Sequence, residues 1–449
     1  MRPEPSIDGD DARPRRRRWR LVAVAGLTAT VLSGCLWSNP GYNVEGQGSN
    51  SSSTGITADN VASLRESWHR DVAGINALPV VESGAGLIHT AVGSEVPGEF
   101  PIGIGTAIGL RPADGSIVWQ TRVPRGDSAA QSPSDISMVR GNVAVSVTPD
   151  CSVCSPNTVR FDARTGAVLD DDFTRGTYVL DAGERVVSVW SHVIGEPLGT
   201  EGRVGIYPKG SDPVFVPLGG NFGDHPVSRL AIGGDRAFFS LGQGLLGVDL
   251  DPADRSCGSP PFCYVGQAGL DGRGTAPVLS SDHDTVFVAT AAGTLSAFDA
   301  TDPAGAGSTY PLRWKASLGD PVTARPALSA DGLVVATATG TVAVFDPEGC
   351  GAAACSPVWT TTVPGAVTEQ PTIAGGLVYV ASAATQFGPT TVSAFPVSCS
   401  TACSPLWSVD TGLVLSGPVV VSDRGRVFIS GSVAGATGPV SRVIAYRPA

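Results

Sequence analysis

A short β-rich run recurs eight times along this chain, and this recurrence limits the folds that the chain can adopt. The eight copies start at Gly86, Gly141, Glu184, Asp235, Asp284, Asp331, Gly376 and Gly425. A second run follows each copy and ends in one bulky apolar residue, in turn Leu110, Phe161, Tyr207, Val248, Phe298, Phe345, Phe395 and Tyr446. These end points lie about 41 to 51 residues apart, the period of a four-stranded propeller blade. The pattern predicts eight blades.

Residues 274–319 show the unit most clearly. Residues 276–279, 285–290, 294–299 and 314–317 are expected to form its four strands. Asp282 and Gly293 stand in the turns, where Asp and Gly tolerate the conformations that tight hairpins need. Neither face of such a sheet can be left in water, so each blade must pack on its neighbours and the ring must close.

The two ends of the chain predict how the ring closes. The last copy, residues 417–448, supplies only three strands. Residues 66–72 carry Trp68, in the place where other copies have Trp119, Trp314, Trp359 and Trp407. We therefore expect an all-β fold, an eight-bladed β-propeller of four-stranded antiparallel blades over residues 58–449, with its last blade closed by the N-terminal strand.

Several fragments resemble the PQQ-like repeat of quinoprotein dehydrogenases and of the propeller lipoprotein of outer-membrane-protein assembly. They include Ala-Phe-Asp at 297–299, Ala-Val-Phe-Asp at 343–346 and Asp-Gly-Ser-Ile-Val-Trp at 114–119. The likeness covers nearly all of residues 57–449 and implies the fold, but not the function. The dehydrogenases use two adjacent cysteines, a calcium ion and a carboxylate base. No two cysteines are adjacent here, so we assign no cofactor, no metal and no catalytic residue.

The first 34 residues are expected to be a signal peptide. A run of arginines precedes an apolar stretch from Leu21 to Leu32, which is too short to span a bilayer. The following Leu-Ser-Gly-Cys resembles the bacterial lipobox, which implies acylation of Cys35 and a place on the outer face of the cell membrane. An ordinary signal peptide and a short membrane anchor are the alternatives. Residues 35–57 are rich in Gly, Ser and Asn, and we expect a flexible tether there.

The other eight cysteines form four local pairs. In an exported chain, an even set at short spacing indicates disulfides, here Cys151–Cys154, Cys257–Cys263, Cys350–Cys355 and Cys399–Cys403. A redox role for the first pair, which has Cys-x-x-Cys spacing, is the alternative. No helix pattern follows that pair to lower a thiolate pKa.

The loops that lead from one blade into the innermost strand of the next converge on one face of a propeller. Polar residues precede a recurring proline in these loops: Asn76, Thr275, Arg325, Glu369, Gln370 and Ser416. They predict a binding funnel, with ordinary solvated loop residues as the alternative.

These features favour a cell-envelope lipoprotein that acts as a binding or assembly scaffold through its propeller face. Its partner would be an envelope protein or glycan, and the lipid anchor would be its only link to the membrane. The formal charge of −11 argues against nucleic-acid binding, and we expect a monomer. The alternative function is that of a PQQ-dependent oxidoreductase of alcohols or sugars.

Overall fold

The structure is a computed structural model of the chain. It describes residues 36–53, 55–93, 105–124, 131–149, 156–194, 199–218, 227–251, 264–301, 308–385, 387–399, 403–436, 438 and 440–449. All of these belong to the second of the two units into which the chain divides, Gly34–Ala449.

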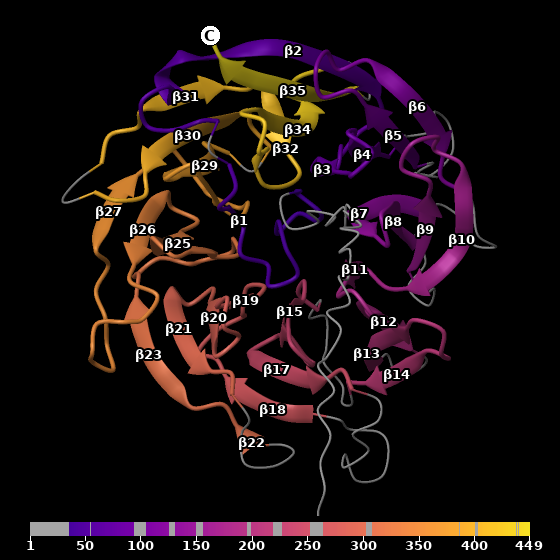
Figure 1. Ribbon diagram of the computed structural model, residues 1–449. Helices are drawn as coiled ribbons and strands as arrows, with labels where there is room; N and C mark the ends of the chain where they lie inside the picture. Colours follow the sequence, from indigo (N-terminus) through magenta and orange to yellow (C-terminus); the bar gives the residue numbers. More distant parts are fainter. Residues whose placement is uncertain are drawn as a thin grey trace, which may run out of the picture. The chain divides into compact units, whose positions relative to one another are not determined.

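Eight antiparallel sheets stand in a ring in this unit, and each forms one blade (Figure 1). Blade 1 contains β3 (Val81–Glu82), β4 (Ile88–Val92), β5 (Thr106–Leu110) and β6 (Ile117–Arg122), and blade 2 contains β7 (Gln131–Val139), β8 (Asn142–Pro149), β9 (Asn157–Phe161) and β10 (Val168–Arg175). Blade 3 contains β11 (Tyr178–Asp181), β12 (Arg185–Ile194), β13 (Gly199–Pro208) and β14 (Val214–Pro217). Blade 4 contains β15 (Ala231–Gly233), β16 (Arg236–Leu241), β17 (Gly244–Asp249) and β18 (Tyr264–Gly269), with β22 (Ser308–Thr309) at its edge.

Blade 5 contains β19 (Val278–Leu279), β20 (Thr285–Ala289), β21 (Thr294–Asp299) and β23 (Leu312–Ser317), and blade 6 contains β24 (Ala327–Ser329), β25 (Gly332–Ala336), β26 (Thr341–Phe345) and β27 (Trp359–Thr362). Blade 7 contains β28 (Thr372–Ala374), β29 (Leu377–Ala383), β30 (Thr390–Pro396) and β31 (Trp407–Asp410). Blade 8 contains β32 (Leu413–Leu415), β33 (Val420–Val421), β34 (Val427–Val433), β35 (Val440–Pro448) and β2 (Leu64–Ala73). The all-β propeller of eight blades is thus confirmed. One 3-10 turn, η1 (Val61–Ser63), precedes β2.

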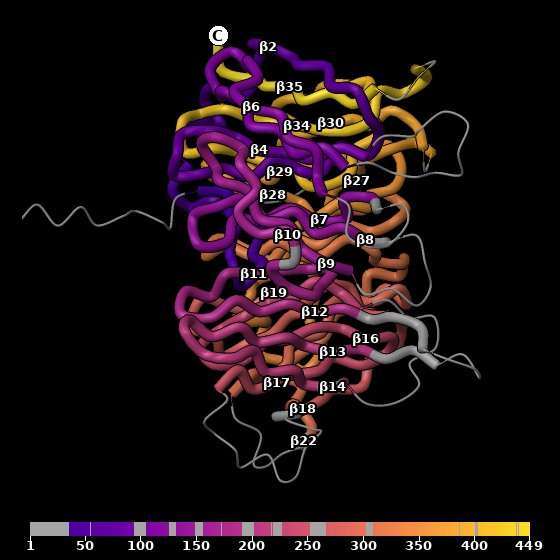
Figure 2. Tube along the Cα trace, turned by 90° about the vertical axis from the view of Figure 1, so that its right-hand side faces the viewer, coloured from indigo at the N-terminus to yellow at the C-terminus, as the bar shows by residue number. Residues whose placement is uncertain are grey.

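The N-terminal strand closes the ring. β2 pairs antiparallel with β35 along its length, with Trp68 opposite Ala445 and a bulge between Glu66 and Trp68. The indigo β2 lies beside the yellow β35 in both views (Figures 1 and 2). An ion pair of 2.5 Å between Arg442 and Asp71 joins the two strands near the funnel end of the blade.

The tryptophan of a fourth strand contacts the next blade in the ring. The indole Nε1 of Trp68 donates a hydrogen bond to the Pro112 carbonyl of blade 1, and that of Trp119 donates to Ala163 of blade 2. A glycine at positive φ faces each ring, Gly115 at +67° and Gly166 at +70°, where a Cβ atom would overlap the indole. The repeated Gly before the fourth strand therefore serves both the turn and the contact between blades.

The segment expected to be a flexible tether has a fixed place in the middle of the ring, and that expectation is corrected. We call residues 36–53 the inner strap; in Figure 1 it runs in indigo inside the ring. Its carbonyls accept hydrogen bonds from innermost strands of successive blades: Trp37 from Glu82, Ser38 from Met138, Val44 from Ile232, Glu45 from Leu279, Gln47 from Leu328 and Gly48 from Ile373. β1 (Ser49–Asn50) pairs with β28, and the Asn50 amide donates to the Val421 carbonyl of β33.

The strap thus follows the ring from blade 1 to blade 8. Trp37 and Tyr42 are buried and pack edge to face, with ring centroids 5.2 Å apart. The Gly, Ser and Asn content that is typical of a solvated linker also lets a backbone enter a narrow channel and bond through its peptide groups.

None of the helical residues in the described ranges forms a segment with the length and apolarity needed to cross a membrane.

Candidate functional site

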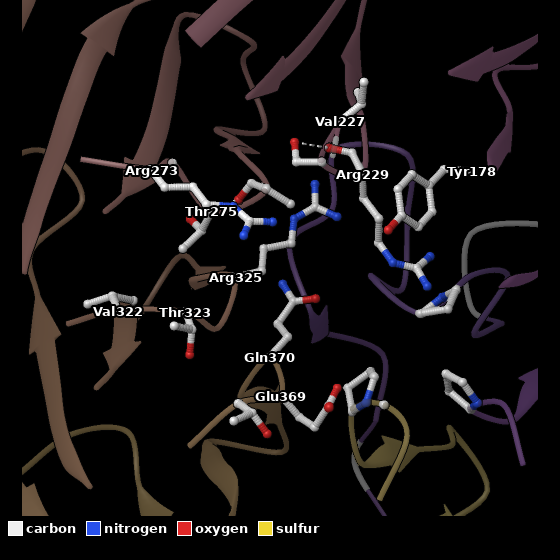
Figure 3. Close-up of a pocket in the computed structure, with 18 of the residues that line it drawn as sticks. Tyr178, Val227, Arg229, Arg273, Thr275, Val322, Thr323, Arg325, Glu369 and Gln370 are labelled. Atoms are coloured by element: carbon white, nitrogen blue, oxygen red, sulfur yellow. Dashed lines mark hydrogen bonds between the residues drawn. The ribbon is translucent and has the colours of Figure 1, made fainter. Parts of the chain in front are cut away.

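The loops that enter the innermost strands surround a cavity of about 510 Å³, which we call the funnel. Five of the six residues predicted from the sequence line it: Thr275, Arg325, Glu369, Gln370 and Ser416. They come from blades 5 to 8, so the closed ring brings together loops that are far apart in the sequence (Figure 3). The prediction of a polar funnel on this face is consistent with this geometry.

Asn76 is not among the lining residues of the funnel. It is exposed, adopts a φ of +53°, and its backbone amide donates to the Ser432 hydroxyl at 2.9 Å. Asn tolerates this left-handed conformation better than most residues, so Asn76 serves the turn between β2 and β3. A recurring position in a repeat does not by itself place every copy in the cavity.

Arg325 forms the floor of the funnel and is not the exposed loop residue that the sequence suggested. It is 8% exposed, its Nε donates to the Pro277 carbonyl at 2.9 Å, and its Nη2 donates to the Leu230 carbonyl at 3.0 Å. Burial lowers the pKa of this guanidinium to about 9. The inner strap lies against it, because a Cβ atom at Gly46 would overlap the guanidinium. Arg325 therefore joins three segments of the ring and holds a positive charge beneath the cavity.

Arg229 is the central residue of a second cluster in the funnel, which the sequence did not reveal. Its Nη2 lies 2.6 Å from Oδ1 of Asp135, a carboxylate that is almost fully buried, and its guanidinium lies 4.8 Å from the centroid of the Tyr178 ring. Burial raises the pKa of Asp135. These three residues come from blades 2 to 4 and share no local motif, so no spacing along the chain could have indicated the cluster.

Glu369 is the carboxyl group that faces the cavity from blade 7. Burial raises its pKa to about 7, and the charge of Arg229 opposes this rise only in part. The neighbouring Gln370 is a structural residue, since its Nε2 donates to the Gly46 carbonyl at 2.9 Å and to the Pro326 carbonyl at 2.7 Å. The strap and the funnel loops are thus bonded to each other.

Arg273 is the exposed cation of the funnel. In the part of the chain that the structure describes, no hydrogen bond or ion pair engages its guanidinium. In Figure 3, Arg229, Arg273 and Arg325 approach the same space from three loops. Three guanidinium groups, one carboxylate paired with Arg229, and a carboxyl with a raised pKa leave the funnel positive in a chain of net charge −11. Guanidinium groups bind carboxylates and phosphates through paired hydrogen bonds, so the cavity suits an anionic group.

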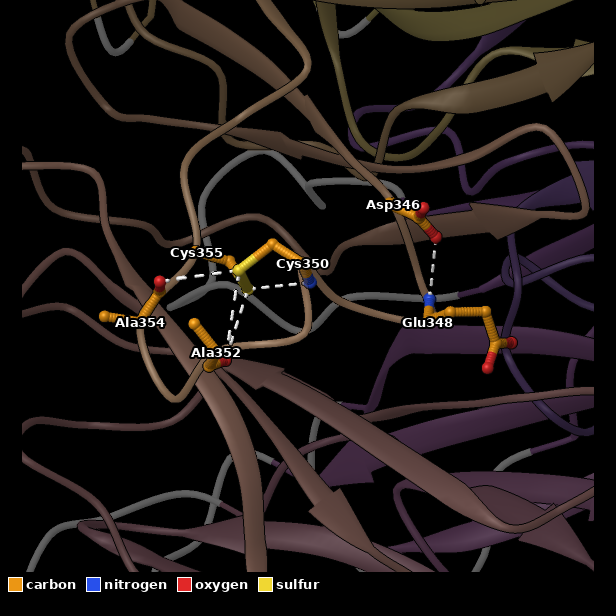
Figure 4. The surroundings of a disulfide bond; sticks show 6 residues. All are labelled: Asp346, Glu348, Cys350, Ala352, Ala354 and Cys355. Carbon is orange, nitrogen blue, oxygen red and sulfur yellow. Dashed lines mark hydrogen bonds between the residues drawn. A yellow bond between two sulfur atoms is a disulfide. The ribbon is translucent and has the colours of Figure 1, made fainter.

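Two of the four predicted disulfides fall on described residues, and both are present. Cys350 bonds to Cys355 in the loop between β26 and β27 (Figure 4), and Cys399 bonds to Cys403 between β30 and β31. Each closes a short loop within its own blade, as expected. The pairs Cys151–Cys154 and Cys257–Cys263, and the predicted lipidation site Cys35, lie outside the described residues.

Comparison with known proteins agrees with the fold. Residues 311–396 match the family model described as outer membrane protein assembly factor BamB. This match covers part of the propeller, and it supports the resemblance of its repeats to the PQQ-like type. Its sequence matches no curated protein.

Solved structures resemble the propeller at low sequence identity. A europium-containing methanol dehydrogenase is 12% identical, with a TM-score of 0.61 over 93% of this chain and 98% of its own. The quinohemoprotein alcohol dehydrogenase ADHIIG from Pseudomonas putida HK5 is 14% identical, with a TM-score of 0.61 over 92% and 80%. Sqt1 of Chaetomium thermophilum, bound to the N-terminus of the ribosomal protein L10, is 12% identical, with a TM-score of 0.57 over 86% and 99%. At these identities the likeness establishes the fold alone.

The funnel does not fit the quinone site that the resemblance to dehydrogenases implies. Such a site needs carboxylate ligands for calcium, whereas Glu369 is the one acidic residue among the described lining residues. No group of three or more His, Cys, Asp or Glu side chains in the described ranges is arranged to hold a metal ion. We therefore derive no reaction step through a quinone.

Proposed function

We propose that this protein is an exported lipoprotein whose propeller acts as a binding scaffold, and that its funnel receives an anionic group of an envelope protein or glycan. The observation that carries this proposal is the positive funnel, with Arg273 exposed at its surface and Arg325 fixed at its floor. A preformed concave site with few, well-placed charged groups is typical of ligand recognition.

The charge distribution supports an anionic partner. The net negative charge of the chain repels anions at long range, while the funnel attracts them at short range. Binding therefore depends on a close fit in the funnel and not on long-range electrostatic attraction. Carboxylate is the shared chemistry of acidic peptides and acidic glycans. The two sources are separated by experiment.

The test is isothermal titration calorimetry of the full-length mature protein with three probes: hexaglutamate, hexagalacturonate and hexaglutamine. We expect binding of at least one anionic probe, weakening with added salt, and no binding of the neutral peptide. Arg273→Glu should weaken this binding at least tenfold. Arg424→Glu, which changes the same charge outside the funnel, is the matched control and should bind as the unaltered protein does.

Equal binding of hexaglutamine, or unchanged binding after Arg273→Glu, would show that the funnel is not the anion site. A further arm adds PQQ and calcium with an electron-accepting dye. Stoichiometric quinone together with turnover of an alcohol or sugar would replace the scaffold proposal by the oxidoreductase alternative.

A further inference from the structure

The predicted lipidation site is close in sequence to the first residues of the folded ring. Trp37 is fully buried, and its carbonyl accepts a hydrogen bond from the Glu82 amide at 2.8 Å. Cys35 precedes Trp37 by two residues, a separation that spans at most about 7 Å of chain. If Cys35 is acylated as proposed, this short span keeps the part of the ring where Trp37 enters next to the lipid.

That part of the ring is the face opposite the funnel. The chain passes from Pro79, which lines the funnel, into β3, which ends at Glu82. It likewise passes from Pro418 of the funnel into β33, which ends at Val421. The turns that follow, 83–87 and 422–426, therefore lie at the other end of the strands. Leu36 lines a small hollow together with residues of both turns. We call this end of the blades the turn face.

Arginines gather beside Leu36 on the turn face. Arg424 and Arg426 line the same hollow as Leu36, and Arg111 adjoins Pro112 in its wall. Burial, with the neighbouring charges of Arg447 and Arg424, lowers the pKa of Arg426. Arg424, Arg447 and Arg111 are exposed. Asp423, in the same turn, and the exposed Asp114, near Arg111, are acids of this sector, while Glu82 has a pKa raised to about 7 by burial. This sector is therefore positive.

Exposed apolar side chains have the same bias toward the turn face. The described residues include ten large hydrophobic side chains that are exposed. Nine of them begin an outer strand, or directly precede one, at the turn-face end: Ile117, Val118, Val168, Leu169, Val214, Phe215, Leu312, Val358 and Leu406. The tenth, Phe387, lies between β29 and β30 at the funnel end and is 79% exposed.

The turn-face loops of blades 4 to 6 carry more acids, among them Asp235, Asp284, Asp331 and Glu348, whereas in blades 8 and 1 the arginines outnumber Asp423 and Asp114. An anionic surface repels those blades and attracts the arginines of blades 8 and 1. Contact is thus restricted to the sector beside the anchor.

We propose that this sector, formed by Arg111, Arg424, Arg426, Arg447, Ile117 and Val118, rests on an anionic lipid surface and holds the funnel open toward the side away from the membrane. The inference rests on the proposed lipidation of Cys35, and it adds a protein surface to the lipid anchor as a membrane contact.

The test is hydroxyl-radical footprinting of the full-length mature protein in vesicles of phosphatidylcholine, with and without phosphatidylglycerol. We expect oxidation of Ile117 and Val118 to fall at least threefold in the anionic vesicles, while that of Phe387 stays unchanged. Arg424→Glu with Arg447→Glu should abolish this protection. Arg273→Glu in the funnel is the matched control and should leave it intact. Melting curves of each variant confirm that the ring is folded.

Protection of Phe387, or protection of Ile117 that persists after the double charge reversal, would overturn the proposal. The mass of the N-terminal peptide from the same sample reports separately on Cys35. If Cys35 carries no acyl group, the proposed localisation fails. In that case the arginine sector is tested by adding the same protein to preformed anionic vesicles at low salt. If Ile117 and Val118 are not protected from oxidation there, the membrane contact is refuted.

Discussion

Single residues in the funnel show how burial changes the chemistry of a loop. Glu369 and Arg325 have ordinary loop positions in the sequence, yet both are desolvated by the closed ring, which raises the pKa of the acid and lowers that of the base. Arg325 bonds to carbonyls of two other blades, so it belongs to the framework of the site. Arg273, which is exposed, is the better residue with which to probe binding.

Glu369→Gln should change how stability depends on pH. The pKa of Glu369 is about 7 in the folded protein, above its value of about 4.3 in an unfolded chain. Between these values the folded state keeps a proton that the unfolded state loses, so stability falls as pH rises through this window. The variant lacks this loss. Its advantage should grow from pH 4 to pH 7, to at most about 4 kcal/mol, and then level off.

Urea unfolding at pH 4, 6 and 8 measures this effect. Glu82 also has a raised pKa of about 7 and remains in both proteins, so only the difference between them is diagnostic. A difference that does not vary with pH would contradict a raised pKa for Glu369. Anion binding in the funnel should also weaken as the pH rises through 7, because ionised Glu369 competes for the arginines.

The inner strap has little regular secondary structure, but its hydrogen bonds reach most of the blades. It contacts the first strands of seven blades through backbone groups and the Asn50 side chain. Those strands would otherwise present unpaired edges to the channel. The strap therefore belongs to the folded domain, and the propeller extends to residue 36 and not only to residue 58.

Trp37→Ala should destabilise the protein by about 3 to 5 kcal/mol, the usual cost of removing a buried aromatic side chain. The stability of Trp37→Phe should stay close to that of the unaltered protein, because an aromatic side chain is kept. The indole Nε1, which is lost, has no hydrogen-bond partner among the described residues. Ser51→Ala, at an exposed strap position, is the control. Equal stability of Trp37→Ala and the control, measured by urea unfolding, would mean that the strap does not stabilise the ring.

The disulfides act on single loops. Replacing Cys350 and Cys355 together by Ser should cost about 2 kcal/mol, since a small loop gives little entropy to remove. Peptide mapping without reduction should find this bond and the Cys399–Cys403 bond. We also predict Cys151–Cys154 and Cys257–Cys263, and any link between blades or a free thiol at these positions would count against local pairing.

At the scale of the whole molecule, closure couples distant parts of the chain. The pairing of β2 with β35 joins the two ends of the propeller, and the strap crosses the ring before β2 begins. Both termini of the domain therefore depend on the closed ring. The arginines of three adjacent blades, Arg229, Arg273 and Arg325, come together at the funnel.

Mass spectrometry of the mature N-terminus tests the proposed anchoring. We expect a chain that begins at Cys35 and carries acyl groups. Cys35→Ser should remove the acyl mass and the membrane association, with the signal peptide retained. A mature chain that begins elsewhere, or an unmodified Cys35, would leave the protein without its proposed anchor.

The sequence by itself determined the blade, the number of blades and the closing strand. These features are repeated or local, and hydrophobic alternation, turn residues and the recurring Trp encode them directly. It also placed five funnel residues, because repeats put equivalent loops on one face. Only the tertiary structure decided that the strap fills the channel, that Arg325 is buried, and that Arg229 meets Asp135 and Tyr178. Those facts depend on which segments the ring encloses, and composition cannot distinguish a solvated backbone from one whose peptide groups bond to strand edges.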